Sequence, residues 1–149
     1  MATVLFACTH NAGRSQIAAA LFDRAAQGRH RALSAGTQPA ARPHPEVVEA
    51  LREVGIDIAD RTPRLLDQQL AGQADVLVTM GCGERCPHVP GAQRIEWELP
   101  DPRGRPLEEV RALRERIEGL VQELLEQLDR EGSRAGAGAP GRAGPAAAP

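Results

Sequence analysis

One short segment near the N-terminus, CTHNAGRS at residues 8–15, brings together several residues that can do chemistry. A cysteine begins the segment, an arginine follows six positions later, and a serine comes directly after the arginine. The segment lies between an apolar run that predicts a buried strand and a stretch whose apolar spacing predicts a helix. A loop in this place can turn its backbone N–H groups toward a tetrahedral oxyanion, with the positive end of the helix dipole behind it. The pattern therefore predicts an oxyanion-binding loop that begins with a cysteine.

The residues of this loop fit nucleophilic chemistry. The planar guanidinium of Arg14 can hold two oxygens of one oxyanion. The same cation and the same N–H groups favour the thiolate form of Cys8, and the Ser15 hydroxyl can donate a hydrogen bond to its sulfur. Gly13 permits a backbone turn that a Cβ atom would hinder. We expect the loop to bind its substrate through Thr9, His10, Asn11, Ala12, Gly13 and Arg14.

The spacing of Cys8 and Arg14 is not specific by itself, because the chain contains 18 arginines and no lysine. Its place between a strand and a helix, together with the serine that follows, makes the pattern specific. The alternative is a buried and unreactive Cys8 beside a helix-capping loop. Asn11 either stabilises the loop through hydrogen bonds or helps to hold a monovalent cation.

Two further cysteines follow an apolar run at residues 75–79, the clearest candidate for a central strand. Because strand ends meet at the same edge of a parallel sheet, we expect Cys82 and Cys86 on the same edge as Cys8. Together with His88 they offer three zinc ligands and no convincing fourth, whereas structural zinc sites usually have four. We therefore expect no metal site, and two inert buried thiols are a further alternative.

Composition excludes several classes of protein. The chain has 149 residues, a formal net charge of −2, scattered arginines, no tyrosine and only three aromatic residues. These features argue against a protein that binds nucleic acid or a membrane surface. No apolar stretch is long enough for a signal peptide or a membrane span. Three cysteines are too few and too uneven for a secreted disulfide scaffold, so we expect a cytoplasmic protein with reduced thiols.

Strand and helix patterns alternate along the chain, which predicts an α/β fold with a parallel sheet covered by helices on both faces. We expect one domain over residues 1–131, followed by a disordered tail rich in Gly, Ala and Pro at residues 132–149. The predicted strands are Thr3–Ala7, Arg31–Gly36, Asp75–Thr79 and Arg94–Trp97, and the predicted helices are Ser15–Gln27, Pro45–Val54, Arg64–Leu70 and Pro106–Arg130.

Over about residues 3–130 the sequence resembles the low-molecular-weight protein tyrosine phosphatases and the arsenate reductases that share their fold. The resemblance rests on the loop at residues 8–15, the turn Ser34–Thr37 and the segment Trp97–Arg116. It implies a three-layer α/β/α fold with a four-stranded parallel sheet. His10 departs from the family, which often has Gly there. This histidine either tunes the charge of the loop or simply faces solvent.

Asp101-Pro102 lies on a loop before the last predicted helix. Taken alone, Asp-Pro is most often a turn opener. In the phosphatases of this family the matching Asp protonates the leaving oxygen, so the resemblance implies that Asp101 is a general acid. Those phosphatases carry aromatic walls beside this loop, where this chain has Arg103-Gly104-Arg105. We expect a small inorganic oxyanion as substrate, with these two arginines helping to attract it.

The stretch Met80–Pro87 resembles the corresponding loop of three-cysteine arsenate reductases. The resemblance implies that Cys8 attacks arsenate, and that Asp101 helps a hydroxyl group to leave as water. Cys82 then attacks the Cys8 sulfur and releases arsenite, and Cys86 attacks Cys82 to leave a Cys82–Cys86 disulfide for thioredoxin to reduce. An i, i+4 spacing within one helical turn suits such a disulfide.

Three other functions remain open from the sequence. The first is an arsenate reductase that uses mycothiol or glutathione with a glutaredoxin-like partner, in which case Cys82 and Cys86 are dispensable. The second is a phosphatase acting on small phosphoesters. The third is a module that binds oxyanions or metals without turnover. We expect a monomer without a cofactor.

Overall fold

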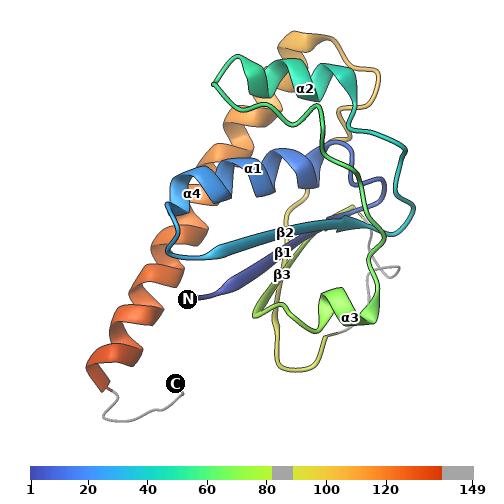
Figure 1. Cartoon of the computed structure of the whole chain (residues 1–149). Helices are drawn as coiled ribbons and strands as arrows, with labels where there is room; N and C mark the ends of the chain where they lie inside the picture. Colours follow the sequence, from blue (N-terminus) through green and yellow to red (C-terminus); the bar gives the residue numbers. More distant parts are fainter. Residues whose placement is uncertain (82–88, 139–149) are drawn as a thin grey trace.

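The computed structural model describes residues 1–81 and 89–138, with side chains described as far as residue 131. Its centre is a sheet of four strands in the order β2-β1-β3-β4, and each neighbouring pair is parallel. Figure 1 shows β1 inside the sheet, between β2 and β3. The four-stranded parallel sheet is therefore confirmed. The strands are β1 Thr3–Cys8, β2 Arg31–Gly36, β3 Val76–Met80 and β4 Gln93–Glu96.

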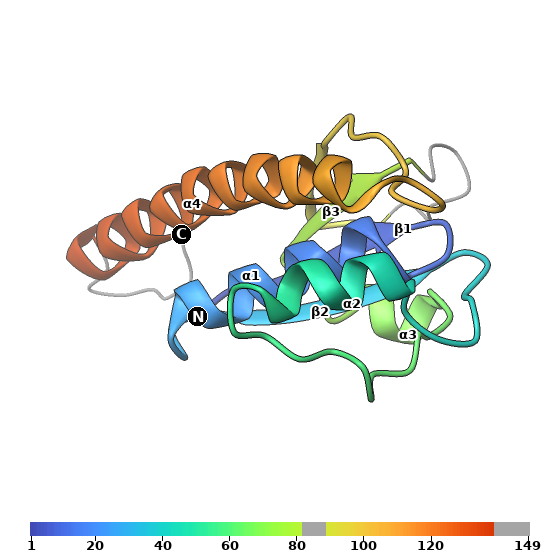
Figure 2. The same cartoon turned by 90° about the horizontal axis from the view of Figure 1, so that it is seen from above.

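Helices cover the two faces of the sheet unequally. The helices α1 (Arg14–Ala26), α2 (Pro45–Arg52) and α4 (Leu107–Gly138) contribute to the larger hydrophobic core on one face. The short helix α3 (Gln68–Ala71) contributes to a smaller core on the other face. Figures 1 and 2 show α1, α2 and α4 on one side of the sheet and α3 on the opposite side. The expected three layers are present.

The side chains of β1 alternate between these two cores, as the pleat of a strand requires. Phe6 and Cys8 belong to the larger core, whereas Leu5 and Ala7 belong to the smaller one. The Phe6 ring lies 5.6 Å from the ring of Phe22 and 5.8 Å from that of Trp97, measured between centroids. The three aromatic residues of the chain therefore pack together beneath the strand that ends at Cys8.

The helix predicted at Arg64–Leu70 is wrong in its first half. Leu65 forms a parallel bridge with Gly36, and the Gly36 carbonyl accepts a hydrogen bond from the Leu66 N–H at 2.9 Å. The helix begins only after Asp67, whose side chain accepts a hydrogen bond from the Leu70 N–H at 2.8 Å. Pairing with the sheet edge therefore keeps the start of this segment extended.

The last helix is longer than the sequence predicted. It was expected to end at Arg130, with the domain ending at residue 131, but α4 continues to Gly138. The added residues include Arg134, Ala135 and Ala137, and Arg and Ala are good helix formers. Disorder was expected from residue 132 onward, but residues 132–138 are helical; residues 139–149 lie outside the described residues, and their disorder stays a prediction. Within the residues described, no helix combines the length and the apolar character needed to cross a membrane.

Parallel pairing brings the ends of three strands together at one edge of the sheet. Cys8, the last residue of β1, lies opposite Met80, the last residue of β3. It also lies opposite Gly36, the last residue of β2. The loops that follow β1 and β3 therefore start next to each other, and this edge carries the candidate site.

Candidate functional site

The backbone carbonyls of the loop at residues 8–15 are engaged from outside the loop. The Asn11 carbonyl accepts a hydrogen bond from the Gln16 side chain at 2.9 Å, and the Gly13 carbonyl accepts one from Ile17 of α1 at 3.0 Å. Four others accept from N–H groups of the next segment along the sheet edge: Cys8 from Thr37 (3.2 Å), Thr9 from Gln38 (2.7 Å), His10 from Ala40 (2.9 Å) and Ala12 from His44 (2.9 Å).

The N–H groups of the same loop are left for a ligand. Among the described residues, none of the backbone N–H groups from Thr9 to Gly13 has a hydrogen-bond acceptor. A run of such groups beside a helix N-terminus forms a binding site for an anion. The geometry therefore has the donors that a tetrahedral oxyanion needs.

A chain of hydrogen bonds holds the cysteine side chain in this loop. Cys8 is only 2% exposed, and its sulfur lies 2.9 Å from the Ser15 hydroxyl oxygen. The Asn11 side-chain amide donates to that same oxygen at 2.8 Å. Because a thiolate can only accept, Ser15 is the donor whenever Cys8 is ionised. The Ser15 hydroxyl is therefore in position to donate a hydrogen bond to a Cys8 thiolate.

Asn11 fixes the shape of the loop. Its backbone has φ of 51°, a left-handed conformation that Asn adopts more readily than most residues. Its side-chain oxygen accepts a hydrogen bond from the Arg64 N–H at 3.0 Å. Both ends of the amide therefore bind protein groups, as expected for a residue that stabilises the loop.

Arg14 is buried at the start of α1, with only 9% of its surface exposed. One terminal nitrogen donates to the Leu99 carbonyl at 3.1 Å, and the other lies 3.9 Å from a carboxylate oxygen of Asp101. The Nε atom is buried and has no partner among the described residues. An unpaired buried N–H of a charged group is costly, and a bound oxyanion would remove that cost.

A glycine at the end of β3 makes room for this guanidinium. Gly81 has φ of +91°, and a Cβ atom there would come within 2.6 Å of a terminal nitrogen of Arg14. The Gly81 carbonyl also accepts a long hydrogen bond, 3.5 Å, from the Thr9 hydroxyl. The lack of a side chain at Gly81 therefore allows the guanidinium of Arg14 to approach the backbone closely.

The Asp-Pro loop closes over the oxyanion loop. A Cβ atom on Gly13 would lie 2.7 Å from Pro102, so the glycine permits contact between the two loops. Asp101 is partly exposed, and one of its carboxylate oxygens accepts a hydrogen bond from the Arg103 N–H at 3.0 Å. The structure therefore brings Cys8, Arg14, Ser15 and Asp101 into one site.

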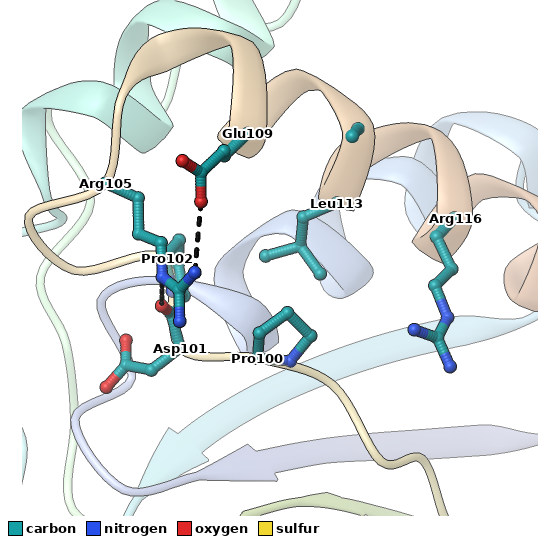
Figure 3. A pocket seen from close by; sticks show the side chains of 8 residues that line it. Pro100, Asp101, Pro102, Arg105, Glu109, Leu113 and Arg116 are labelled. Carbon is teal, nitrogen blue, oxygen red and sulfur yellow. Dashed lines mark hydrogen bonds and ion pairs between the residues drawn. The ribbon is translucent and has the colours of Figure 1, made fainter.

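Arg105 anchors the Asp-Pro loop, a role that the sequence analysis missed. Its Nε atom donates to the Asp101 carbonyl at 3.2 Å, and Nη1 pairs with Glu109 at 3.0 Å. Figure 3 shows this side chain between Asp101 and Glu109 of α4, beside a pocket of about 250 Å³. Arg105 was expected to attract the substrate, but it is engaged in holding the loop. In the sequence, the i, i+4 spacing of Arg105 and Glu109 could have indicated this ion pair.

Two histidines lie on the outer side of the oxyanion loop. The ring centroids of His10 and His44 are 6.5 Å apart, and His44 lies beside Gly13. Burial is the main cause that lowers the pKa of His44, while the carboxylates of Glu46 and Asp101 oppose the shift. His10 lies in the oxyanion loop and is visible in the sequence for that reason, whereas no motif marks His44.

The two remaining cysteines lie outside the described residues, as does His88. Neither the expected role of Cys82 and Cys86 nor the zinc alternative is therefore tested by the geometry. Among the residues that are described, no group of His, Cys, Asp or Glu side chains is arranged to hold a metal ion.

Comparison with known proteins identifies the family. The model of the low molecular weight phosphotyrosine protein phosphatase family matches residues 3–134. Arsenate reductase 2 of Staphylococcus epidermidis is 33% identical over 123 residues, which cover 80% of this chain and 93% of the relative.

Two solved structures share the fold. The thioredoxin-dependent arsenate reductase Cg_ArsC1' of Corynebacterium glutamicum superposes with a TM-score of 0.77 and 39% identity, over 88% of this chain and 63% of that longer chain. The YwlE arginine phosphatase of Geobacillus stearothermophilus gives a TM-score of 0.78 and 28% identity, over 88% of this chain and 95% of that one. The protein described here therefore belongs to the low molecular weight phosphotyrosine protein phosphatase family.

Proposed function

We propose that this protein reduces arsenate to arsenite, with Cys8 as the nucleophile and Cys82 and Cys86 as resolving cysteines. The observation that carries the proposal is a buried thiol, bonded to Ser15, at the start of a loop of free N–H donors. A chain with this loop and two more cysteines after β3 has the thiols that a two-electron reduction requires. The arsenate reductases among its relatives support the same reading.

The first step forms a bond between sulfur and arsenic. Arsenate binds to the N–H groups of Thr9 to Gly13 and to the guanidinium of Arg14, whose Nε is free to donate. The Cys8 thiolate attacks arsenic, and one As–O bond breaks. Asp101, held near Arg14, gives its proton so that the oxygen leaves as water.

The second step reduces arsenic. The Cys82 thiolate attacks the Cys8 sulfur, which forms a disulfide and breaks the S–As bond. The electron pair of that bond stays on arsenic, so As(V) becomes As(III) and arsenite is released. The Cys86 thiolate then attacks Cys82, which frees the Cys8 thiolate and leaves a Cys82–Cys86 disulfide. A thioredoxin-like dithiol reduces this disulfide and completes the cycle.

The position of Gly81 supports this route. Gly81 precedes Cys82 in the chain, lies against the guanidinium of Arg14 and accepts a hydrogen bond from Thr9. The segment with the resolving cysteines therefore starts beside the oxyanion loop.

A phosphatase reaction is the second candidate. Asp101 lies 3.9 Å from Arg14, where it could protonate the leaving oxygen of a phosphate ester, and the arginine phosphatase shares the fold. In that reaction the Cys8 thiolate attacks phosphorus, and water then hydrolyses the phosphocysteine. Cys82 and Cys86 have no part in it, which makes the two candidates separable.

The test is to mix fully reduced protein with arsenate, without added reductant, and to measure arsenite and free thiols. We expect wild type to release one arsenite and lose two thiols per chain. Cys86→Ser should release one arsenite and stop with Cys8 bonded to Cys82, whereas Cys82→Ser should release none. Cys8→Ser is the control that blocks every route.

Three outcomes would contradict this proposal. Full turnover of Cys82→Ser with thioredoxin would exclude the cascade. Turnover of that variant only with glutathione or mycothiol and a glutaredoxin would indicate the small-thiol route. Efficient hydrolysis of para-nitrophenyl phosphate without arsenite release would indicate a phosphatase.

A further inference from the structure

We propose that a hollow beside the oxyanion loop is a second anion-binding site, which takes a hydrated tetrahedral oxyanion. The hollow has a volume of about 420 Å³. Four of its lining side chains are cationic or can become so: His10, Arg42, His44 and Arg103. Of the described residues that line it, none is acidic. Such a concentration of positive charge stands out in a chain whose formal net charge is −2.

The two guanidinium groups of the hollow are available to a ligand. In the part of the chain that the structure describes, neither the Arg42 nor the Arg103 side chain has a hydrogen bond or an ion pair. Other arginines of the chain are engaged, among them Arg14, Arg29, Arg105, Arg111 and Arg114. The two free guanidinium groups carry like charges, and a bound anion would offset the repulsion between them.

The hollow adjoins the oxyanion loop. His10 belongs to both, and its carbonyl is bonded to the Ala40 N–H on the hollow's side of the loop. His44 lies against the loop at Gly13, where an added Cβ atom would be 3.4 Å from the imidazole. An anion in the hollow therefore binds next to the reactive loop and leaves its N–H groups free for substrate.

The size of the hollow indicates how tightly it binds an oxyanion. A volume of about 420 Å³ is larger than one tetrahedral oxyanion needs, so the ion keeps part of its water and some contacts run through that water. Such partly hydrated contacts on exposed arginines give weak binding, with a Kd on the order of 1 mM. The site suits an oxyanion that is held briefly in the hollow beside the oxyanion loop.

Protonation of His44 adjusts the strength of this site. Burial keeps the pKa of His44 low, and the groups that face it are Glu46, Asp101, His10 and Arg103. An anion in the hollow stabilises the protonated imidazole, so binding and protonation favour each other. Anion affinity at the hollow should therefore rise as the pH falls.

The experiment is an NMR titration of the reduced protein with sodium sulfate at pH 6.5, with sodium chloride as the control for ionic strength. Sulfate stays a dianion throughout and cannot be reduced by thiols under these conditions. We expect the imidazole signals of His10 and His44 to follow their own binding curve, separate from the curve of the Thr9–Gly13 amides. His30, which is bonded to Asp129 far from the hollow, serves as the internal reference.

A double variant, Arg42→Gln with Arg103→Gln, assigns the site. We expect sulfate binding at His44 to weaken at least fivefold, while the curve of the loop amides changes by less than twofold. The matched control is Arg31→Gln with Arg61→Gln, which removes two exposed arginines elsewhere and should change neither curve. Thermal unfolding of both double variants checks that they remain folded.

The proposal fails if His44 does not respond to sulfate, or if it follows the loop amides in wild type and in the double variant alike. It also fails if the control variant weakens binding at His44 as much as the test variant does. Because only sulfate binding is measured, the outcome is independent of whether the protein reduces arsenate.

Discussion

At the scale of single residues, Ser15 is the point where the hydrogen bonds of the site converge. It is fully buried, lies 2.9 Å from the Cys8 sulfur and receives the Asn11 amide at 2.8 Å. Asn11 in turn binds the Arg64 N–H. The state of the nucleophile therefore depends on a short chain of contacts that starts at Ser15.

Replacing Ser15 with alanine should slow the reaction of Cys8. A hydrogen bond to a charged group contributes about 1.5–3 kcal/mol, which corresponds to a roughly 10- to 100-fold lower rate of thiolate chemistry. The measurement is the rate of iodoacetamide labelling of Cys8 at pH 7, in a background without Cys82 and Cys86. Ser15→Thr keeps a hydroxyl and is the matched control. An unchanged labelling rate in Ser15→Ala would show that the hydroxyl does not support the thiolate.

At the scale of elements, the end of α2 is joined to α4 by one carboxylate. Glu53, directly after α2, accepts hydrogen bonds from Arg111 and Arg114 of α4, both at 2.9 Å. Arg114 also donates to the Ala50 carbonyl at 2.6 Å. The hydrogen bonds from the two arginines lower the pKa of Glu53 from 4.5 to about 2. These contacts fix α2, and with it the segment before α2 that lies along the oxyanion loop.

The lowered pKa of Glu53 predicts how its contacts with Arg111 and Arg114 respond to acid. A carboxyl whose pKa is lower in the folded state stabilises the fold above its unfolded pKa, and this contribution is lost as the pH falls from about 4.5 to about 2. Glu53→Gln should therefore lower the free energy of unfolding at pH 7, and its difference from wild type should shrink toward pH 2. Urea unfolding across this pH range measures the difference. Glu118→Gln, an exposed change on α4, is the control, and a pH-independent difference for Glu53→Gln would contradict the prediction.

At the scale of the whole molecule, α4 extends along the larger core and has buried side chains as far as Leu128. The sequence after residue 131 is GSRAGAGAPGRAGPAAAP, which has no large apolar side chain. Because burial of apolar surface is the main stabilising contribution, the chain up to residue 131 should account for the stability of the fold.

A chain shortened after residue 131 should unfold with a free energy within about 0.5 kcal/mol of the full chain, as for a surface change. Leu128→Ala, which leaves a cavity at a buried position, should lower the free energy of unfolding by about 2–5 kcal/mol. This variant is the control that shows whether the assay detects a change in the C-terminal part of α4. Urea unfolding followed by circular dichroism measures both. If truncation destabilises the chain as much as Leu128→Ala does, the C-terminal segment has a structural role that its composition does not predict.

Much of the architecture could be predicted from local pattern. The strand Arg31–Gly36 was predicted with its observed bounds, and the parallel sheet followed from the alternation of strands and helices. Periodicity succeeds here because a strand buried on both faces and an amphipathic helix leave different apolar spacings in the sequence. The segment at Arg64–Leu70 was mispredicted because its backbone pairs with Gly36, a residue far away in the chain.

By itself, the sequence determined the chemistry that this protein has available: a cysteine, an arginine and a serine at fixed spacing between a strand and a helix. Local connectivity is enough for that, because the strand end and the helix start position the loop. Only the tertiary structure decided the contacts between distant segments. It placed Gly81 against Arg14, bonded Arg14 to the Leu99 carbonyl and lined one hollow with His10, His44, Arg42 and Arg103. Those contacts depend on how the loops pack at the edge of the sheet, and no local pattern records that packing.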